Sequence, residues 1–130
     1  MSIDLRTTGV HHIALRVTDL ERSKRFYVST LGFPVVAEFL DLVLFSAGPV
    51  VFGIRSPDER SPSGDSFDPF RVGLDHVALI CEDEAELERV AGRLEEEGIW
   101  NTGAKLDEAL GKRYVAFKDP DGIKWEYYMA

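Results

Sequence analysis

The sequence predicts an α+β fold of two tandem β-α-β-β-β modules that pair into a cupped, mixed β-sheet with the helices outside. The first supporting observation is an internal repeat: residues 11–17 (HHIALRV) recur about 64 residues later as residues 75–81 (DHVALIC). The second is that a helical pattern and three strand-like segments follow each copy in the same order. Because one helix covers only one face of a sheet, the partner module is expected to close the other face.

Each copy of the repeat is predicted to be a strand whose side chains alternate between two faces. In the first copy His12 shares a face with Ala14 and Arg16, and His76 holds the equivalent inward place in the second copy. By the same alternation His11 points away from His12, and it is expected to be a structural residue. The opposite faces are apolar enough to lie under a helix: Ile13, Leu15, Val17, Val77, Leu79 and Cys81.

A helix is expected directly after each of these strands. Residues 18–21 form a capping box of the Ser/Thr-x-x-Glu type that begins at Thr18, and residues 83–86 are similar. Apolar residues recur at helical spacing in both segments. Gly32 and Gly98 are placed to end the two helices.

Three further strands are expected in each half. They span residues 34–39, 42–46 and 50–55 in the first half and 100–105, 112–118 and 124–129 in the second. Turn residues at 47–49 and 119–122 separate the last two strands of each half. The expected organisation is one domain over residues 1–130, with modules at about 10–55 and 72–130 and a linker rich in Ser, Pro, Asp and Gly at 56–71.

Length and composition exclude several classes of protein. A chain of 130 residues can bury a core without disulfides, and the single Cys81 is expected to be packed rather than catalytic. The formal net charge of -8 disfavours binding to duplex nucleic acid, which depends on Lys and Arg. No apolar run approaches the length of a membrane span and no signal-like segment opens the chain, so a cytoplasmic protein is expected.

A set of motifs extends over most of the chain: His12-x-x-Leu15-x-Val17-x-Asp19-Leu20, Phe26-Tyr27, Leu31-Gly32-Phe33, His76, and Asp119-Pro120-Asp121-Gly122 followed by Glu126. In these motifs the chain resembles the vicinal oxygen chelate superfamily, which includes glyoxalase I, bleomycin resistance proteins and extradiol dioxygenases. In metal-dependent members the ligands lie at the positions held here by His12, His76 and Glu126. The resemblance therefore implies one divalent metal ion, and it implies a homodimer because members commonly pair.

The residue types agree with such a metal site. Two neutral imidazoles and one carboxylate suit Fe(II), and also Mn(II), Co(II), Ni(II) or Zn(II), and leave coordination positions open. A metal ion with open positions can stabilise an enolate, lower the pKa of bound water or position oxygen. The alternative is an unoccupied triad in which Glu126 forms an ion pair with Arg16, which shares the His12 face.

Three further residues are candidates for substrate contacts. Arg113 and Tyr114 are expected near the mouth of the cup, where they could hold an anionic or phenolic substrate, and Arg16 lies on the inward face of the first module. Tyr114 has the parity of Glu126 only if the intervening turn keeps the register. Glu126 is also the candidate catalytic residue: proton transfer is expected to fall to metal-bound hydroxide or to Glu126 moving off the metal, since no other carboxylate is clearly placed inside the cup.

Two departures from the family pattern narrow the range of reactions that the chain is expected to catalyse. The strand at residues 50–55 lacks the carboxylate or amide that gives glyoxalase I its fourth ligand, so strict glyoxalase I activity is not expected. Extradiol dioxygenases use additional active-site histidines and a tyrosine on the strand before the terminal turn. This chain has three histidines in all and has Ala116 at the position of that tyrosine. Ordinary extradiol ring cleavage is therefore less expected.

The leading hypothesis is a metal-dependent glyoxalase/dioxygenase-like enzyme whose small substrate chelates the metal through adjacent oxygens, with lyase, isomerase or oxygenase chemistry left open. The alternative is a metal-free binding protein that sequesters a drug or metabolite, as bleomycin resistance proteins do. Net acidity and an aromatic content of 11% permit this alternative. The three candidate ligands argue against it, because a pure binder has no use for them.

Overall fold

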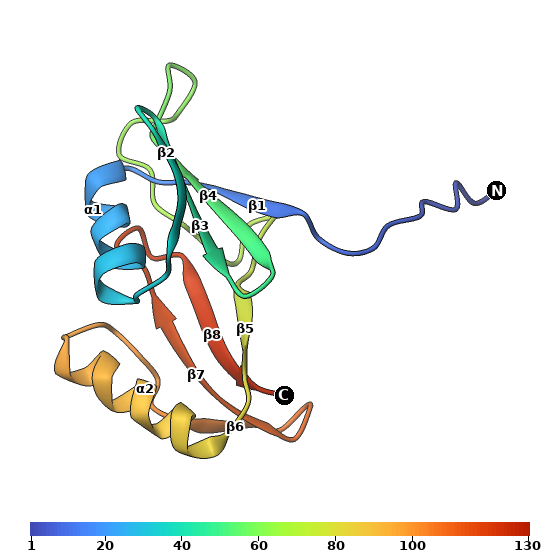
Figure 1. The fold of residues 1–130 in the computed structure, drawn as a ribbon, viewed down its shortest axis with the longest axis vertical. Helices are drawn as coiled ribbons and strands as arrows, with labels where there is room; N and C mark the ends of the chain where they lie inside the picture. The colour runs from blue at the N-terminus through green and yellow to red at the C-terminus, as the bar shows by residue number, and fades with distance from the viewer. The chain divides into compact units, whose positions relative to one another are not determined.

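The structure is a computed structural model that describes residues 1–130. It divides into two compact units, Met1–Ser63 and Gly64–Ala130 (Figure 1). The first unit contains β1 (His12–Arg16), α1 (Leu20–Lys24), a π-helical segment η1 (Arg25–Thr30), β2 (Val35–Phe39), β3 (Leu42–Ala47) and β4 (Val50–Arg55). The second unit contains β5 (Val77–Cys81), α2 (Glu84–Glu96), β6 (Lys105–Asp107), β7 (Lys112–Lys118) and β8 (Lys124–Met129).

Each unit holds one four-stranded mixed sheet. The strand order is β1-β4-β3-β2 in the first unit and β5-β8-β7-β6 in the second. In both sheets the first and last strands of the unit pair in parallel, and the other neighbours are antiparallel. A parallel pair needs a long crossover connection, and in each unit that connection contains the helix. The predicted α+β fold of two tandem β-α-β-β-β modules is confirmed.

The faces that were predicted to be apolar are the buried ones. In the first unit Leu15 and Val17 are buried, whereas His12 and Arg16 are exposed on the other face of β1. In the second unit α2 lies beside β7 (Figure 1) and also packs against β5 and β8. Cys81 is fully buried beneath this helix. Cys81 is therefore a packed core residue, as predicted.

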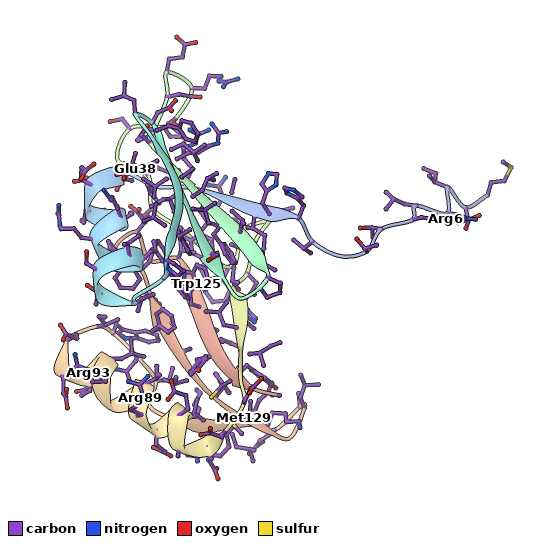
Figure 2. All side chains as sticks on the ribbon, in the orientation of Figure 1. Arg6, Glu38, Arg89, Arg93, Trp125 and Met129 are labelled. Carbon is purple, nitrogen blue, oxygen red and sulfur yellow. The ribbon has the colours of Figure 1, made fainter.

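Aromatic side chains fill the core of each unit. Tyr27 from η1 stacks on Phe45 of β3 with ring centroids 5.0 Å apart, and Phe45 stacks in turn on Phe52 of β4 at 5.6 Å. In the second unit Trp125 of β8, labelled in Figure 2, lies beside Phe117 of β7 with ring centroids 6.4 Å apart. Burial of this apolar area, more than helix propensity, holds the helices to their sheets.

The two α-helices begin at aspartates. Asp83 caps α2, as predicted, because its Oδ1 accepts a hydrogen bond of 2.7 Å from the backbone N–H three residues later. The prediction that the first cap begins at Thr18 is wrong. Asp19 Oδ1 accepts from the Arg22 backbone N–H at 3.1 Å, while Thr18 Oγ1 accepts from the Arg22 guanidinium at 2.8 Å. None of the helices combines the length and the apolar character needed to cross a membrane.

One predicted strand is displaced along the chain. The strand expected at residues 100–105 is found at Lys105–Asp107, and the earlier part forms only a single bridge, between Asn101 and Phe117. The cause is a local turn, in which Asn101 Oδ1 accepts from the Gly103 backbone N–H at 2.8 Å. Side-chain bonds of this kind compete with the hydrogen-bond ladder of a strand.

The turn predicted at residues 119–122 is confirmed and sets the position of β8. Oδ1 of the buried Asp119 accepts from the backbone N–H groups of Asp121 at 2.9 Å and Ile123 at 2.8 Å. Gly122 takes a positive φ of 82°, which suits glycine. The turn pairs β7 with β8 without a break in register.

Candidate functional site

The candidate site in the second unit is built around His76 and Glu126. Glu126 lies in β8, where it pairs with Ala78 of β5, and His76 directly precedes β5. His76 Nε2 is 3.3 Å from Glu126 Oε1. Only 10% of the Glu126 side chain is exposed, so its carboxylate is largely removed from water. Two of the three predicted ligands are therefore neighbours.

Asp75 determines which nitrogen of His76 carries the proton. Asp75 Oδ1 is 2.6 Å from His76 Nδ1, and this hydrogen bond lowers the pKa of Asp75. Asp75 is thus a carboxylate that accepts the Nδ1 proton. A neutral imidazole then presents a lone pair at Nε2. This lone pair and the Glu126 carboxylate face each other across 3.3 Å, and a proton or a metal cation between them would satisfy both.

This arrangement fits a divalent transition metal. Imidazole and carboxylate are the donor types that such metals take, and metal-binding histidines usually donate their second N–H to a carboxylate, as His76 does to Asp75. Within each unit no group of three or more His, Cys, Asp or Glu side chains gathers as a complete metal site. The second unit by itself therefore contains a partial donor set, His76 and Glu126.

Lys124 lies beside the same carboxylate. It precedes Glu126 by two residues on β8 and so shares its face of the sheet. Lys124 Nζ is 3.6 Å from Glu126 Oε2, so the two oxygens of Glu126 face different partners. Neither Lys124 nor Asp75 was predicted to belong to the site. Two sequence signals point to them: Lys124 lies two residues before Glu126, and Asp75 directly precedes His76.

In the first unit His12 is the first residue of β1, and its side chain is exposed. The predicted separation of His11 from His12 is wrong, since their Nδ1 atoms are 2.8 Å apart and their rings meet edge to face. His11 precedes the strand, so strand alternation does not govern its direction. Arg16 donates from Nη1 to the Ser56 carbonyl at 2.6 Å and lies 3.9 Å from Asp58. The segment after β4 therefore holds the Arg16 side chain.

The strand next to β1 offers no further ligand on the face that His12 shares. The β1 and β4 register places Val51 opposite His12, and Gly53 and Arg55 follow on the same face. Valine and glycine side chains have no donor atom, and a guanidinium does not release its proton to bind a metal.

Tyr114 lies on the Glu126 face of the second sheet. In the β7 and β8 pairing Ala116 is opposite Glu126 and Tyr114 is opposite Tyr128, so the turn has kept the register. The rings of Tyr114 and Tyr128 stack with centroids 5.6 Å apart. Ala116 is buried and presents only a methyl group beside Glu126. The phenol side chains on this face are those of Tyr114 and Tyr128, each two residues along its strand from the pair of Ala116 and Glu126.

Arg113 lies on the other face of β7. Its guanidinium donates to Glu84 at 2.6 Å and to Glu88 at 2.9 Å, and both acceptors belong to α2. Arg113 therefore fastens α2 to the sheet on the face opposite to Glu126. This corrects the expectation that Arg113 and Tyr114 lie together.

Tyr128 was not predicted as a site residue, although its spacing of two from Glu126 places it on the same face. Its hydroxyl donates to Asp107 Oδ2 at 2.8 Å, and Lys105 Nζ lies 5.8 Å from the centroid of the Tyr114 ring. Burial, and then the hydrogen bond to Asp107, raise the pKa of Tyr128 to about 12. The same hydrogen bond lowers the pKa of Asp107. The pair is thus a protonated phenol held by a carboxylate.

Replacing Asp107 by asparagine is expected to lower the pKa of Tyr128 from about 12 but leave it above the ordinary value of about 10, because burial remains. In the wild type the folded-state pKa lies above the unfolded one. The protonated Tyr128 phenol therefore makes its full contribution to the free energy of unfolding below about pH 10, and this contribution is lost as the pH rises toward 12. Ultraviolet absorbance titration measures the pKa, and Tyr128→Phe identifies the transition. Identical titrations of Asp107→Asn and the wild type would contradict the assignment.

Comparisons with known proteins agree with this architecture. Residues 9–127 match the family model of the Glyoxalase/Bleomycin resistance protein/Dioxygenase superfamily. The chain is 34% identical over 130 residues to the uncharacterized protein YwkD of Bacillus subtilis, covering 92% of this chain and 95% of that protein. It is 33% identical over 129 residues to the uncharacterized protein YaeR of Escherichia coli, covering 92% and 94%. A crystal structure of a glyoxalase family protein from Enterococcus faecalis is 30% identical, with a TM-score of 0.76 and coverage of 93% of this chain and 97% of that one.

Proposed function

Because the chain belongs to the glyoxalase/bleomycin resistance protein/dioxygenase superfamily, we propose that it is a metal-dependent enzyme. Its substrate is a small molecule that chelates the metal through two adjacent oxygens. The proposed ligands of one divalent ion (Fe, Mn, Zn, Ni or Co) are His76 and Glu126 of the second unit and His12 of the first. A homodimer is proposed because members of the superfamily that the chain resembles commonly pair.

The observation that supports this proposal best is the contact between His76 and Glu126. The proton of His76 is held at Nδ1 by Asp75, and Nε2 faces the largely buried carboxylate. A neutral His76 at this place leaves two acceptors opposed, which costs free energy unless a proton or a metal cation lies between them. His12 enters the proposal because it holds the place in the first copy of the repeat that His76 holds in the second.

The proposed chemistry assigns separate tasks to the side chains. When bound, the divalent ion supplies a Lewis acid that polarises a substrate oxygen. Asp75 holds the His76 ring in one tautomer and one orientation. Glu126 would carry the transferred proton when its carboxylate is released from the metal, because it is the carboxylate beside the proposed ligand His76. Tyr114 and Arg16 remain the proposed substrate contacts.

Metal analysis of protein purified without chelator tests the proposal, with about one equivalent of a transition metal expected. In isothermal titration of EDTA-treated protein with Mn(II), His12→Ala and His76→Ala are expected to lower the affinity about 100-fold. Asp107→Asn, which removes a carboxylate bonded to Tyr128, is the control, and its affinity is expected to stay within about threefold of the wild type. Less than about a tenth of an equivalent, unchanged after reconstitution, would contradict the proposal and favour a metal-free binding protein.

A further inference from the structure

The sheet face that carries Glu126 concentrates positive charge in a chain that is acidic overall. The chain has a formal net charge of -8 and contains five lysines. Strand alternation and register place four of these lysines on the Glu126 face: Lys105, Lys112, Lys118 and Lys124. The acidic side chains that β6, β7 and β8 place on this face are Asp107 and Glu126. The helix on the other face, α2, is instead rich in glutamate.

Lys124 is the member of this group that reaches the proposed site. Its ammonium lies 3.6 Å from Glu126 Oε2, and its side chain is 31% exposed. Lys118 is the cross-strand neighbour of Lys124, and its ammonium lies 4.3 Å from the centroid of the Trp100 ring. Lys112 donates to the backbone carbonyl of Ala130 at 2.8 Å. Lys124 is thus accessible and already pairs with a carboxylate.

The charges around the proposed ligands do not balance without an anion. Two neutral imidazoles and the Glu126 carboxylate leave one positive charge of a divalent ion uncompensated. Lys124 adds a second positive charge 3.6 Å from Oε2 of Glu126. The Asp75 carboxylate, which is hydrogen-bonded to His76 Nδ1, offsets one of these positive charges. The remaining charge favours a ligand that brings its own negative charge.

On the basis of the proposed function, we infer that Lys124 is a substrate-anchoring residue and that the substrate class is a compact carboxylate with a second oxygen on the adjacent carbon. In the metal-free protein the Lys124 ammonium pairs with Glu126. With the carboxylate engaged at a cation, the ammonium is free to pair with the anionic substrate. Lys124 therefore opposes metal binding and favours anion binding at the same place.

Isothermal titration tests both effects with Mn(II) and oxalate as probes. In EDTA-treated protein, Lys124→Met is expected to raise the affinity for Mn(II) about threefold to tenfold, since a like charge is removed. In Mn(II)-loaded protein the same substitution is expected to weaken oxalate binding about tenfold. Lys112→Met is the matched control, because it removes a lysine from the same face about 20 Å away along β7. Its affinities for both probes are expected to stay within about twofold of the wild type.

The outcomes separate this inference from the proposed function. If the wild type binds no Mn(II), the proposed function fails, and the inference fails with it. If the wild type binds Mn(II) but Lys124→Met and Lys112→Met bind oxalate equally well, the inference alone is overturned. A merely structural role of Lys124 would weaken both affinities together. Opposite changes for metal and anion support the inference, and circular dichroism of the variants checks that they are folded.

Discussion

Replacing Glu126 by glutamine is expected to lower the affinity for Mn(II) about 100-fold or more and to leave the metal-free protein at least as stable as the wild type. The amide has nearly the same shape as the carboxylate but no charge. It therefore loses the strong metal donor while relieving the cost of a carboxylate whose side chain is only 10% exposed. Isothermal titration measures the affinity, and thermal denaturation with and without Mn(II) measures the stability.

Asp107→Asn is the matched control for Glu126→Gln. Asp107 is a carboxylate on the same sheet face, but it bonds to Tyr128 and does not contact His76. Its removal is expected to leave the Mn(II) affinity within about threefold of the wild type. Wild-type affinity in Glu126→Gln would remove this residue from the proposed ligands. A large loss in both variants would indicate a general effect of charge on the face.

Replacing Trp125 by alanine is expected to destabilise the protein by about 3 to 5 kcal/mol. Trp125 has 0% of its surface exposed and lies beside Phe117 in the core beneath α2. The substitution removes buried apolar area and leaves a cavity that the two neighbouring strands cannot close. Urea unfolding followed by circular dichroism measures the loss, which is a large part of the stability of a domain of this size.

Trp100→Ala is the matched control, because Trp100 is 54% exposed and contacts the Lys118 ammonium at its ring. Its loss is expected to cost less than about 1 kcal/mol. Where Trp125→Ala fails to fold, Trp125→Phe keeps the measurement possible and is expected to show a smaller loss of the same sign. Equal losses for Trp100→Ala and Trp125→Ala would contradict the assignment of Trp125 to the core.

The fold was predictable because its signals are local and repeated. The alternation in β1 and β5 separates buried from exposed positions, and the turn at Asp119 keeps the register of β7 and β8. The displaced strand at residues 100–105 was not predictable from the same signals. There the competing turn depends on one side-chain bond of Asn101, which a pattern of apolar residues does not report.

The candidate site was predictable only in part. His76 and Glu126 follow from the repeat and from strand parity, and their contact follows from the register of β5 and β8. Alternation places Lys124 on the correct face, but it does not say that an ammonium pairs with Glu126. The prediction that His11 points away from His12 failed because side-chain alternation applies only within a strand, and β1 begins at His12.

The short strand β6 has a consequence for the behaviour of the protein at high concentration. An outer strand presents unpaired N–H and C=O groups on which another chain can build, and this is a route to aggregation. β6 offers only the three residues Lys105–Asp107 for such pairing, with a charged side chain at each end. The turn at Gly103 on one side and the turn before β7 on the other interrupt the regular strand after three residues. This edge of the second sheet therefore resists intermolecular strand addition without a covering helix.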